Sequence, residues 1–359
     1  MKAVVLVGGA GTRLRPLTYT TPKPLLPIAN IPFVERQLDW LAAYGVDEAV
    51  LSLGYLPDAF TRHFADERHG DMKLRFVVEH EPLGTAGGIR FAAEGINERL
   101  IVCNGDVLTD LDLSAFVAFH EARGAEATIS LTRVDDPSAF GVVPTRADGE
   151  VIAFVEKPPR DQAPTNWINA GTYVLEPAAL AAIPPRLNVS IERETFPRML
   201  ERPGRLYAMR SSGYWLDIGT PDKYLEAHDD ALAGRLGAPP APGARETAPG
   251  VWMQGDVDVD PSAEIVAPVL LGAGARVEKG ARVHASVVGA ATVVEANAVI
   301  DRAVLHARVR VAAGARVQTS IVGPDAVLEA DCTLEAEAII GAGVTIGRGS
   351  HLAGDRVPS

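Results

Sequence analysis

Aliphatic residues recur at intervals of six through about the last hundred residues of the chain, and this internal repeat constrains the fold more than any other feature. In a left-handed parallel β-helix, each hexad forms one face of a triangular coil, and its aliphatic side chain points inward to stack on neighbouring coils. The strands of an ordinary β-sandwich would show a period of two instead. We therefore predict a β-helix over residues 251–353, followed by a tail over residues 354–359.

The repeat contains sixteen hexads with two breaks of phase. Small residues such as Gly272, Gly274, Ala275 and Gly280 suit its tight corners. The register of the middle block stays open by one residue, because Val288-Gly289 also fits the pattern. The aliphatic positions are Val259, Ile265, Leu271, Val277, Val283, Val287, Val293, Val299, Leu305, Val311, Val317, Val322, Leu328, Leu334, Ile340 and Ile346.

The chain ahead of the repeat has a different pattern, in which short apolar runs alternate with amphipathic stretches. This alternation predicts β-α units on a largely parallel, Rossmann-like sheet over residues 1–233. A more β-rich stretch from about residue 127 to 175 predicts a mixed extension of that sheet. The expected strands are 4–7, 49–53, 74–78, 100–103, 127–134, 141–143, 151–155 and 170–175, and the expected helices are 33–44, 85–94 and 221–232.

Residues 234–250 are rich in Gly, Pro and Ala and show no period, so we expect a linker between the two domains.

Net charge limits the partners of the chain. With 34 Lys and Arg against 46 Asp and Glu, the 359-residue chain has a formal net charge of −12. This charge disfavours binding to nucleic acid polymers and to anionic membranes. Its two cysteines, Cys103 and Cys332, have no metal-type spacing, and a reducing compartment fits such sparse use. The apolar run 3–7 is too short for a signal peptide or a membrane span. We expect a cytoplasmic protein.

A glycine-rich turn, GGAGTRLRP at residues 8–16, follows the first expected strand directly. A dinucleotide fingerprint would need a third glycine where Leu14 stands, and a P-loop would need Gly-Lys-Ser/Thr, which is absent. Glycines still let backbone N–H groups approach a triphosphate closely, and Arg13 offers a fork-shaped donor for phosphate oxygens. Lys23, held between two prolines, adds a point charge. The turn therefore predicts phosphate binding.

Two aspartates are candidates for the catalytic centre. Asp106 stands at the carboxyl end of an apolar strand, where ligands bind in open α/β sheets. Asp217 lies between apolar residues in WLDIG. An aspartate in a loop more often caps a turn, so position alone does not assign either residue a function.

The motifs along residues 1–233 resemble those of the nucleoside-diphosphate-sugar pyrophosphorylases, the sugar-1-phosphate nucleotidyltransferases. The matching segments are GGAGTRLRPLTYTTPKPLLPI, EPLGTAGG, CNGDV, FGVVP, VEKP, INAGTYV and YWLDIGTP. GTRLRPLT, EPLGTAG, INAG, SIERETFP and LYAM together look most like the mannose-1-phosphate guanylyltransferase branch, which also includes proteins with a C-terminal hexapeptide β-helix. The resemblance implies a GT-A-like catalytic domain.

The resemblance also implies an activity and a site. The chain would transfer a nucleotidyl group from GTP to mannose 1-phosphate, with Mg²⁺ on Asp106 and Asp217. Arg13 and Lys23 would bind the nucleotide phosphates, and Lys157 the sugar phosphate. The other implied positions are Gly8, Gly9, Gly11, Thr12, Gly84 and Thr85 for the nucleotide, and Gly141, Glu156, Asn169 and Gly171 for the sugar phosphate.

The base-reading residue is predicted from hydrogen-bond patterns. Guanine presents two neighbouring donors, which one carboxylate can accept together, whereas uracil and thymine present a donor between two acceptors and suit an amide better. Pyrimidine-using branches of the family look as though they carry Gln where Glu79 stands here. Glu79 is therefore our candidate guanine reader, and a solvent-facing carboxylate at a strand end is the alternative.

Three other functions compete with this one. A glucose-1-phosphate thymidylyl-, uridylyl- or adenylyltransferase would carry the same core motifs. A non-catalytic homologue would bind nucleotide-sugar without turnover, although retention of the charged residues argues against it. β-Helices also carry acyltransferase sites between subunits, and His284, His306 and His351 lie in this one. Because these histidines show no paired-site pattern, a role in homo-oligomerisation or regulation is the better interpretation.

Overall fold

The computed structural model describes residues 1–358 and divides into two compact units. Unit 1 comprises residues 1–10 and 34–217, and unit 2 comprises residues 11–33 together with the chain from Ile218 onward. The sequence predicted a boundary at residue 233 instead. The difference arises because the segment 11–33 and the helix at 221–232 pack within unit 2. In the part of the chain that the structure describes, no helix is long and apolar enough to cross a membrane.

Unit 1 is built on one mixed sheet with the strand order β11-β10-β12-β7-β1-β4-β6-β5, and β9 pairs with both β12 and β13. Its strands are β1 (Lys2–Leu6), β4 (Glu48–Leu53), β5 (Arg68–His69), β6 (Met72–Val78), β7 (Leu100–Asn104), β9 (Ala127–Arg133), β10 (Gly141–Val142), β11 (Val155–Glu156), β12 (Trp167–Leu175) and β13 (Leu206–Arg210). A separate ribbon pairs β8 (Val107–Thr109) with β14 (Trp215–Asp217).

The sheet has the predicted Rossmann-like character. Strands β7, β1, β4 and β6 run parallel, and β12 joins them antiparallel to β7. The expected strand 151–155 is wrong: Val151 forms only an isolated bridge with Thr145, and regular pairing begins at β11. The helices are α1 (Phe33–Ala43), α2 (Pro57–His63), α3 (Gly84–Ala92), α4 (Leu113–Arg123), α5 (Pro177–Ala181) and α6 (Phe196–Leu200), with a π-turn, η5, at Ile191–Thr195.

Helix α4 shows how local sequence sets these limits. The Asp112 side chain accepts a hydrogen bond from the Ala115 N–H at the start of the helix, which satisfies one of its free donors. Gly124 ends it with a φ of 57°, a left-handed conformation that glycine adopts without steric cost. The helix then packs on β9 and β13, while α3 packs on β1 and β4.

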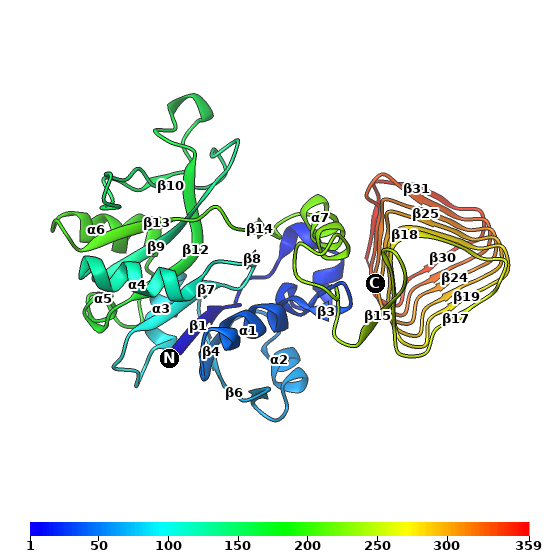
Figure 1. Ribbon diagram of the computed structural model, residues 1–359, viewed down its shortest axis with the longest axis horizontal. Helices are drawn as coiled ribbons and strands as arrows, with labels where there is room; N and C mark the ends of the chain where they lie inside the picture. Colours follow the sequence, from blue (N-terminus) through cyan, green and yellow to red (C-terminus); the bar gives the residue numbers. More distant parts are fainter. Residues whose placement is uncertain (359) are drawn as a thin grey trace. The chain divides into compact units, whose positions relative to one another are not determined.

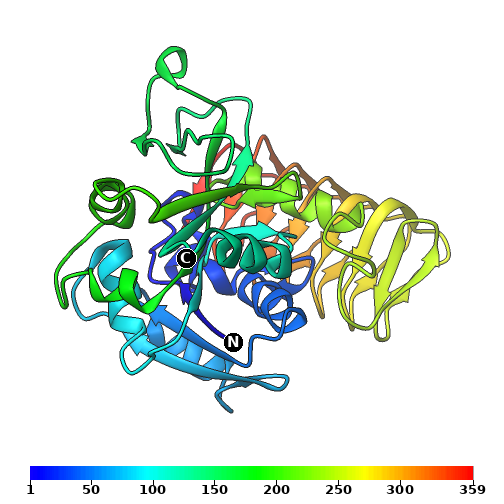
Figure 2. The ribbon, with the colours of Figure 1, turned by 60° about the vertical axis from the view of Figure 1, so that its left-hand side comes forward.

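Unit 2 contains the predicted β-helix, whose triangular coils are visible in Figure 1 and whose stacked rungs are visible in Figure 2. Its strands are β15 (Ala244–Ala248), β16 (Val251–Gln254), β17 (Asp258–Val259), β18 (Glu264–Leu271), β19 (Arg276–Val277), β20 (Arg282–Val288), β21 (Val293–Val294), β22 (Val299–Asp301), β23 (Val304–Leu305), β24 (Arg310–Val311), β25 (Arg316–Gln318), β26 (Ile321–Val322), β27 (Val327–Leu328), β28 (Thr333–Glu335), β29 (Ile339–Ile340), β30 (Thr345–Ile346), β31 (His351–Ala353) and β32 (Arg356–Val357).

The ladder is longer than the sequence predicted. Strand β15 lies inside the expected linker 234–250 and pairs antiparallel with β16. At the other end, β32 lies inside the expected tail 354–359 and pairs with β29 as the last rung. The domain is therefore extended by an antiparallel strand at one end and by a further parallel rung at the other, and neither can be predicted from the aliphatic periodicity alone.

The residues that fill the interior of the coils show the register of the middle block of hexads. Val288, Val294 and Ile300 belong to the core of the β-helix, so the expected inward positions 287, 293 and 299 are wrong by one residue. The reason is that three coils shorten one side from six residues to five, between core positions 283 and 288, 300 and 305, and 317 and 322. At each of these corners a residue turns the chain with a positive φ: Ala285, Arg302 and Thr319.

The rest of unit 2 is the segment 11–33 and one helix. The segment forms three single 3-10 turns, η1 (Thr12–Leu14), η2 (Leu17–Tyr19) and η3 (Lys23–Leu25), followed by a tight hairpin of β2 (Pro27–Ile28) and β3 (Ile31–Pro32). Helix α7 (Pro221–Leu232) packs on β2, β18 and β20.

Candidate active site

The carboxyl ends of β1, β4 and β6 in unit 1 surround a cavity of about 540 Å³. Such strand ends are where open α/β sheets bind ligands. The cavity brings together five residues of the predicted nucleotide-binding set, which are Gly8, Gly9, Glu79, Gly84 and Thr85. Leu6, Gly54, Tyr55, His80 and Pro82 complete its lining.

Gly8 and Gly54 let two strand ends approach each other at this cavity. A Cβ atom built on Gly54 would lie 2.8 Å from the Gly8 carbonyl oxygen, closer than real side chains allow. The same carbonyl accepts a hydrogen bond from the Tyr55 N–H at 3.2 Å. Sequence analysis missed Gly54 and Tyr55, although a Gly-Tyr pair directly after the apolar run 49–53 was the available signal.

Glu79 is held by two hydrogen bonds inside unit 1. Its Oε1 accepts from the Ser52 hydroxyl at 2.8 Å, and its Oε2 accepts from the Leu83 N–H at 3.2 Å. A carboxylate oxygen has two lone pairs, so each oxygen keeps one further acceptor position. The alternative of a freely solvated carboxylate does not fit these contacts, because the side chain is fixed at the cavity wall.

Gly84 and Thr85 connect the cavity to the segment SIER at residues 190–193. Gly84 has a φ of 68°, and a Cβ atom there would lie 2.6 Å from the Val189 carbonyl oxygen, so only glycine fits. The Thr85 hydroxyl donates to Glu192 Oε2 at 2.9 Å and accepts from the Ile191 N–H at 2.8 Å. Through these contacts Thr85 attaches the start of α3 to the segment at residues 190–193 beside the cavity.

The two candidate metal ligands come together at one end of the β8-β14 ribbon. Asp217 pairs with Val107, and Asp106 is the residue directly before Val107. Below them, Gln37 donates its Nε2 hydrogens to the carbonyls of Asn104 and Val107, both at 2.8 Å. This support fixes the backbone on either side of Asp106, and sequence analysis did not single out Gln37.

Gly105 brings the Asp106 turn close to the first strand. A Cβ atom on Gly105 would lie 2.5 Å from the Leu6 carbonyl oxygen, which the Gly105 N–H itself contacts at 2.8 Å. The turn therefore sits directly against the end of β1.

The donor set at this turn fits Mg²⁺. Within residues 1–358 no group of three or more His, Cys, Asp and Glu side chains could hold a metal ion by itself. Mg²⁺, however, is commonly bound by one or two carboxylates together with substrate phosphate oxygens. The pair Asp106 and Asp217 matches that requirement.

The predicted sugar-phosphate residues form two neighbouring groups in unit 1. In the first, Gly141 pairs with Glu156 across β10 and β11. The Glu156 carboxylate faces two cations, with the Lys157 Nζ at 3.7 Å and an Arg193 nitrogen at 3.9 Å. Lys157 is 59% exposed, so these ion pairs are weak and leave its ammonium group accessible.

In the second group, a bulge in β12 places Asn169 and Gly171 beside the end of β7. The pairing of β12 with β9 shifts register between Asn169 and Tyr173. Asn169 accepts from the Gly171 N–H at 3.0 Å and donates to the Tyr173 hydroxyl at 2.8 Å. A Cβ atom on Gly171 would lie 2.8 Å from Asn104 Nδ2, so glycine permits this close approach.

Arg13, Lys23, Gly11 and Thr12 lie in unit 2, on the segment 11–33. Gly11 has a φ of 56°, and a Cβ atom there would lie 2.9 Å from the Lys23 Cβ, so the stem of Lys23 packs on this glycine. Lys23 is 8% exposed, whereas Arg13 on η1 is exposed. A Cβ atom on Gly219 would lie 2.5 Å from an Arg13 guanidinium nitrogen, so that group lies against the Gly219 backbone.

The three histidines of the β-helix are engaged within their own chain. His284 Nδ1 bonds to Asp301 at 2.7 Å, and His351 Nε2 bonds to Glu335 at 2.9 Å. His306 is buried, and its Nε2 lies 3.0 Å from the Tyr224 hydroxyl. These contacts give no support to an acyltransferase site.

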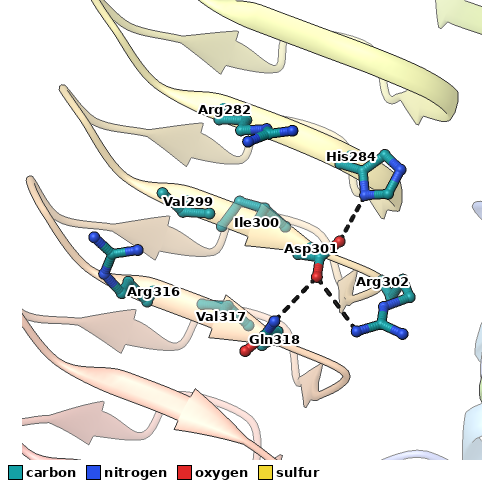
Figure 3. Close-up of a pocket in the computed structure, with 9 residues that line it drawn as sticks. All are labelled: Arg282, His284, Val299, Ile300, Asp301, Arg302, Arg316, Val317 and Gln318. Carbon is teal, nitrogen blue, oxygen red and sulfur yellow. Dashed lines mark hydrogen bonds and ion pairs between the residues drawn. The ribbon is translucent and has the colours of Figure 1, made fainter.

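A hollow of about 420 Å³ on one face of the β-helix carries three arginines, as Figure 3 shows. Arg282 lies 3.5 Å from Glu264, and Arg302 lies 3.5 Å from Asp301. The chain's own carboxylates therefore offset much of the positive charge of this hollow.

Comparisons with known proteins follow the division into two domains. The family described as nucleotidyl transferase matches residues 2–234, and the one described as EIF2B subunit epsilon LbH domain matches residues 249–352. The mannose-1-phosphate guanylyltransferase of Mycobacterium tuberculosis is 39% identical, over 84% of this chain and 83% of its own. Mannose-1-phosphate guanylyltransferase 1 of Arabidopsis thaliana is also 39% identical, over 85% of this chain and 86% of its own.

A solved structure resembles part of the chain. HddC from Yersinia pseudotuberculosis, complexed with GMP-PN, is 32% identical with a TM-score of 0.56, and the match covers 64% of this chain and 98% of that one.

Proposed function

Because the chain belongs to the nucleotidyl transferase family, and the relatives described above are mannose-1-phosphate guanylyltransferases, we propose that it transfers GMP from GTP to mannose 1-phosphate. The products are GDP-mannose and pyrophosphate. The observation that carries the proposal is the cavity of unit 1, where Glu79 lies with the glycines of the phosphate-binding turn. The guanine nucleotide analogue in the related HddC structure supports the choice of base.

The reaction is an in-line displacement at the α-phosphorus of GTP. A phosphate oxygen of mannose 1-phosphate forms the new P–O bond, and the bond to the β-phosphate breaks, so that the electron pair leaves with pyrophosphate. The attacking phosphate is already ionised at neutral pH, so no side chain has to remove a proton. Catalysis then consists of positioning and electrostatic stabilisation.

The guanine base is assigned to the cavity in unit 1. Each Glu79 oxygen can accept one more hydrogen bond beyond those from Ser52 and Leu83, and guanine offers two neighbouring donors. Gly84 leaves room for a flat ring.

The nucleotide phosphates are assigned to the glycine-rich turn. Backbone N–H groups of Gly8, Gly9, Gly11 and Thr12 can approach the triphosphate, since three of these residues lack a Cβ. Arg13 would stabilise the negative charge that develops on the departing pyrophosphate, and Lys23 would neutralise the nucleotide phosphates.

The sugar phosphate is assigned to the second part of the sheet. Lys157 would bind its phosphate, and Glu156 would accept hydrogen bonds from sugar hydroxyls. Asn169, with Gly141 and Gly171 beside the neighbouring strands, would line the same pocket.

Asp106 and Asp217 would hold Mg²⁺, which when bound neutralises phosphate charge and orients the reacting groups. The two carboxylates present hard oxygen donors from neighbouring positions of one ribbon. Gln37 keeps the turn that bears Asp106 in place.

We further propose a cytoplasmic homo-oligomer that assembles through the β-helix. An acidic surface and two buried, unpaired cysteines support the compartment. A regular β-helix with long exposed sheet faces supports the assembly.

A substrate panel tests the function. GTP, ATP, UTP and dTTP are each mixed with Mg²⁺ and with mannose or glucose 1-phosphate, and pyrophosphate release is measured. We expect GTP with mannose 1-phosphate to give the highest kcat/KM. Preference for glucose 1-phosphate with another triphosphate would refute the guanylyl assignment, and no release from any pair would indicate a homologue that only binds nucleotide-sugar.

A further inference from the structure

The segment 11–33, which carries Arg13 and Lys23, is held by residues that lie 197 or more positions later in the sequence. At its hairpin, Asn30 donates to Gln254 Oε1 at 3.0 Å and to the Val288 carbonyl at 3.2 Å. The neighbouring Ala29 N–H donates to His228 Nδ1 at 3.2 Å. These contacts attach the hairpin to the first coils of the β-helix and to α7.

A buried pair on the same side reinforces this attachment. The Tyr224 hydroxyl donates to the Pro27 carbonyl at 2.5 Å and lies 3.0 Å from His306 Nε2. Since the tyrosine proton goes to Pro27, the His306 ring donates its own Nε2 proton to the tyrosine oxygen. Segment, helix α7 and β-helix are therefore joined by one chain of hydrogen bonds.

His306 occupies a special position in the repeat. The residue that follows the inward aliphatic position at this corner is glycine in four coils, Gly272, Gly289, Gly323 and Gly341. The other residues of this column are Gln254, Pro358 and, between Gly289 and Gly323, His306. A Cβ atom on Gly289 would lie 2.4 Å from the backbone of the next coil, which explains the glycines. The single histidine breaks that rule at the coil that contacts Tyr224.

The other end of the segment is attached to the last coil. Arg356 on β32 donates to the Arg13 carbonyl at 2.8 Å and lies 3.5 Å from the Arg15 carbonyl. These carbonyls belong to the η1 turn and its C-cap, where the Leu14 and Arg15 N–H groups bond back to Gly11 and Thr12. Arg356 thus contacts the backbone of the very residue that carries the phosphate-binding guanidinium.

The two attachments lie along a single face of the β-helix, formed by the stacked strands β20, β23, β26, β29 and β32. Four steps between neighbouring strands of about 4.8 Å each span about 19 Å. The segment therefore follows this face from a first coil to the last one. At the far end, Arg356 contacts its arginine turn.

From these contacts we infer that the β-helix positions the phosphate-binding segment, and that Arg356 is a positioning residue for Arg13. This inference rests on the proposed function, in which Arg13 binds pyrophosphate oxygens. Arg356 fixes the Arg13 carbonyl, and the Gly219 backbone lies against the Arg13 guanidinium. The two contacts together set the direction in which the guanidinium points.

Steady-state kinetics of the full-length Arg356→Ala variant in both directions test this role. Without Arg356 the η1 turn keeps its own two hydrogen bonds and its buried Leu14 but loses the hydrogen bonds to the Arg13 and Arg15 carbonyls, so Arg13 samples more orientations. We expect kcat for GDP-mannose synthesis to fall about three- to tenfold, and KM for pyrophosphate in the reverse reaction to rise by a similar factor. KM for mannose 1-phosphate should change less, because Arg13 does not contact it.

Three comparisons separate positioning from a general loss of structure. Arg356→Lys keeps one charged donor and should recover part of the rate. Arg316→Ala removes an equally exposed arginine from another face of the β-helix and should leave kcat, KM and the melting temperature unchanged. In an Arg13→Lys background, Arg356→Ala should cost little, because the guanidinium that it orients is already gone.

The outcomes distinguish this inference from the function on which it rests. Wild-type protein that makes no GDP-mannose refutes the proposed function, whatever Arg356 does. Active wild-type protein with unchanged kcat and unchanged pyrophosphate KM in Arg356→Ala refutes the positioning role alone. An equal loss from Arg356→Ala in wild-type and Arg13→Lys backgrounds also refutes it, because the effect would then not pass through Arg13.

Discussion

Acidification should lower the stability of unit 2, because His306 gains a proton on unfolding. This ring is fully buried, and burial lowers its pKa from 6.5 to about 4. Because the folded pKa lies below the unfolded value, the unfolded state binds the proton more tightly, and stability falls as the pH drops from about 6.5 toward 4. For a shift of this size the loss is about 1.4 kcal/mol at pH 5.5 and about 3 kcal/mol well below pH 4.

The measurement is urea unfolding of wild type and His306→Gln at pH 7.5 and pH 5.5, followed by tryptophan fluorescence. Glutamine does not titrate and can still donate to the Tyr224 oxygen, so the stability difference between the two proteins should shift by about 1.4 kcal/mol in favour of the variant at the lower pH. His351→Gln is the control, since its ring is 62% exposed. A stability difference that is the same at both pH values would show that His306 does not gain a proton on unfolding, and the reasoning would fail.

The remaining predictions concern the substrate site and its support. Glu79→Gln should lower kcat/KM for GTP about tenfold or more and reduce the ratio of kcat/KM for GTP to that for UTP, because one of the two oxygens proposed to accept from guanine becomes a donor. Equal losses for every triphosphate would make Glu79 structural. Asp106→Asn and Asp217→Asn should each lower kcat at limiting Mg²⁺ about a hundredfold or more without changing the melting temperature. A dependence of kcat on Mg²⁺ concentration close to that of the wild type would contradict the metal assignment. A chain ending at Ala233 should lose most of its activity along with assembly, because segment 11–33 loses Gln254, His306 and Arg356; full activity in that fragment would show that the β-helix contacts are dispensable.

Periodicity was sufficient to predict the two folds. The hexad repeat identified the β-helix, and the alternation of apolar runs with amphipathic stretches identified the mixed Rossmann-like sheet; the family matches confirm both and confirm the nucleotidyltransferase class. The motifs also placed Gly8, Glu79 and Gly84 in one set, and the structure brings them into one cavity. These features are readable because each depends on contacts that are close in sequence or repeated.

Features that depend on single corners or distant contacts were not readable. The register of the middle coils was left open because five-residue sides place Ala285, Arg302 and Thr319 at the turns, and none of these residues marks a turn by its chemistry. Gln37 was missed for a similar reason. Nothing in a helical glutamine indicates that its amide supports a turn 70 positions later.

The attachment of segment 11–33 to the β-helix is the largest difference between the structure and the prediction from the sequence. The reason is that a sequence motif includes only part of what determines the position of its residues. A motif records residues that are close in sequence, which is why Arg13 and Lys23 could be proposed as phosphate-binding residues by resemblance. The groups that hold those residues in place are not part of it: Arg356 lies 343 positions from Arg13. Two local signs of this attachment were nevertheless present. Gln254 and His306 stand in the corner column that glycine occupies in other coils, and they contact Asn30 and Tyr224, respectively.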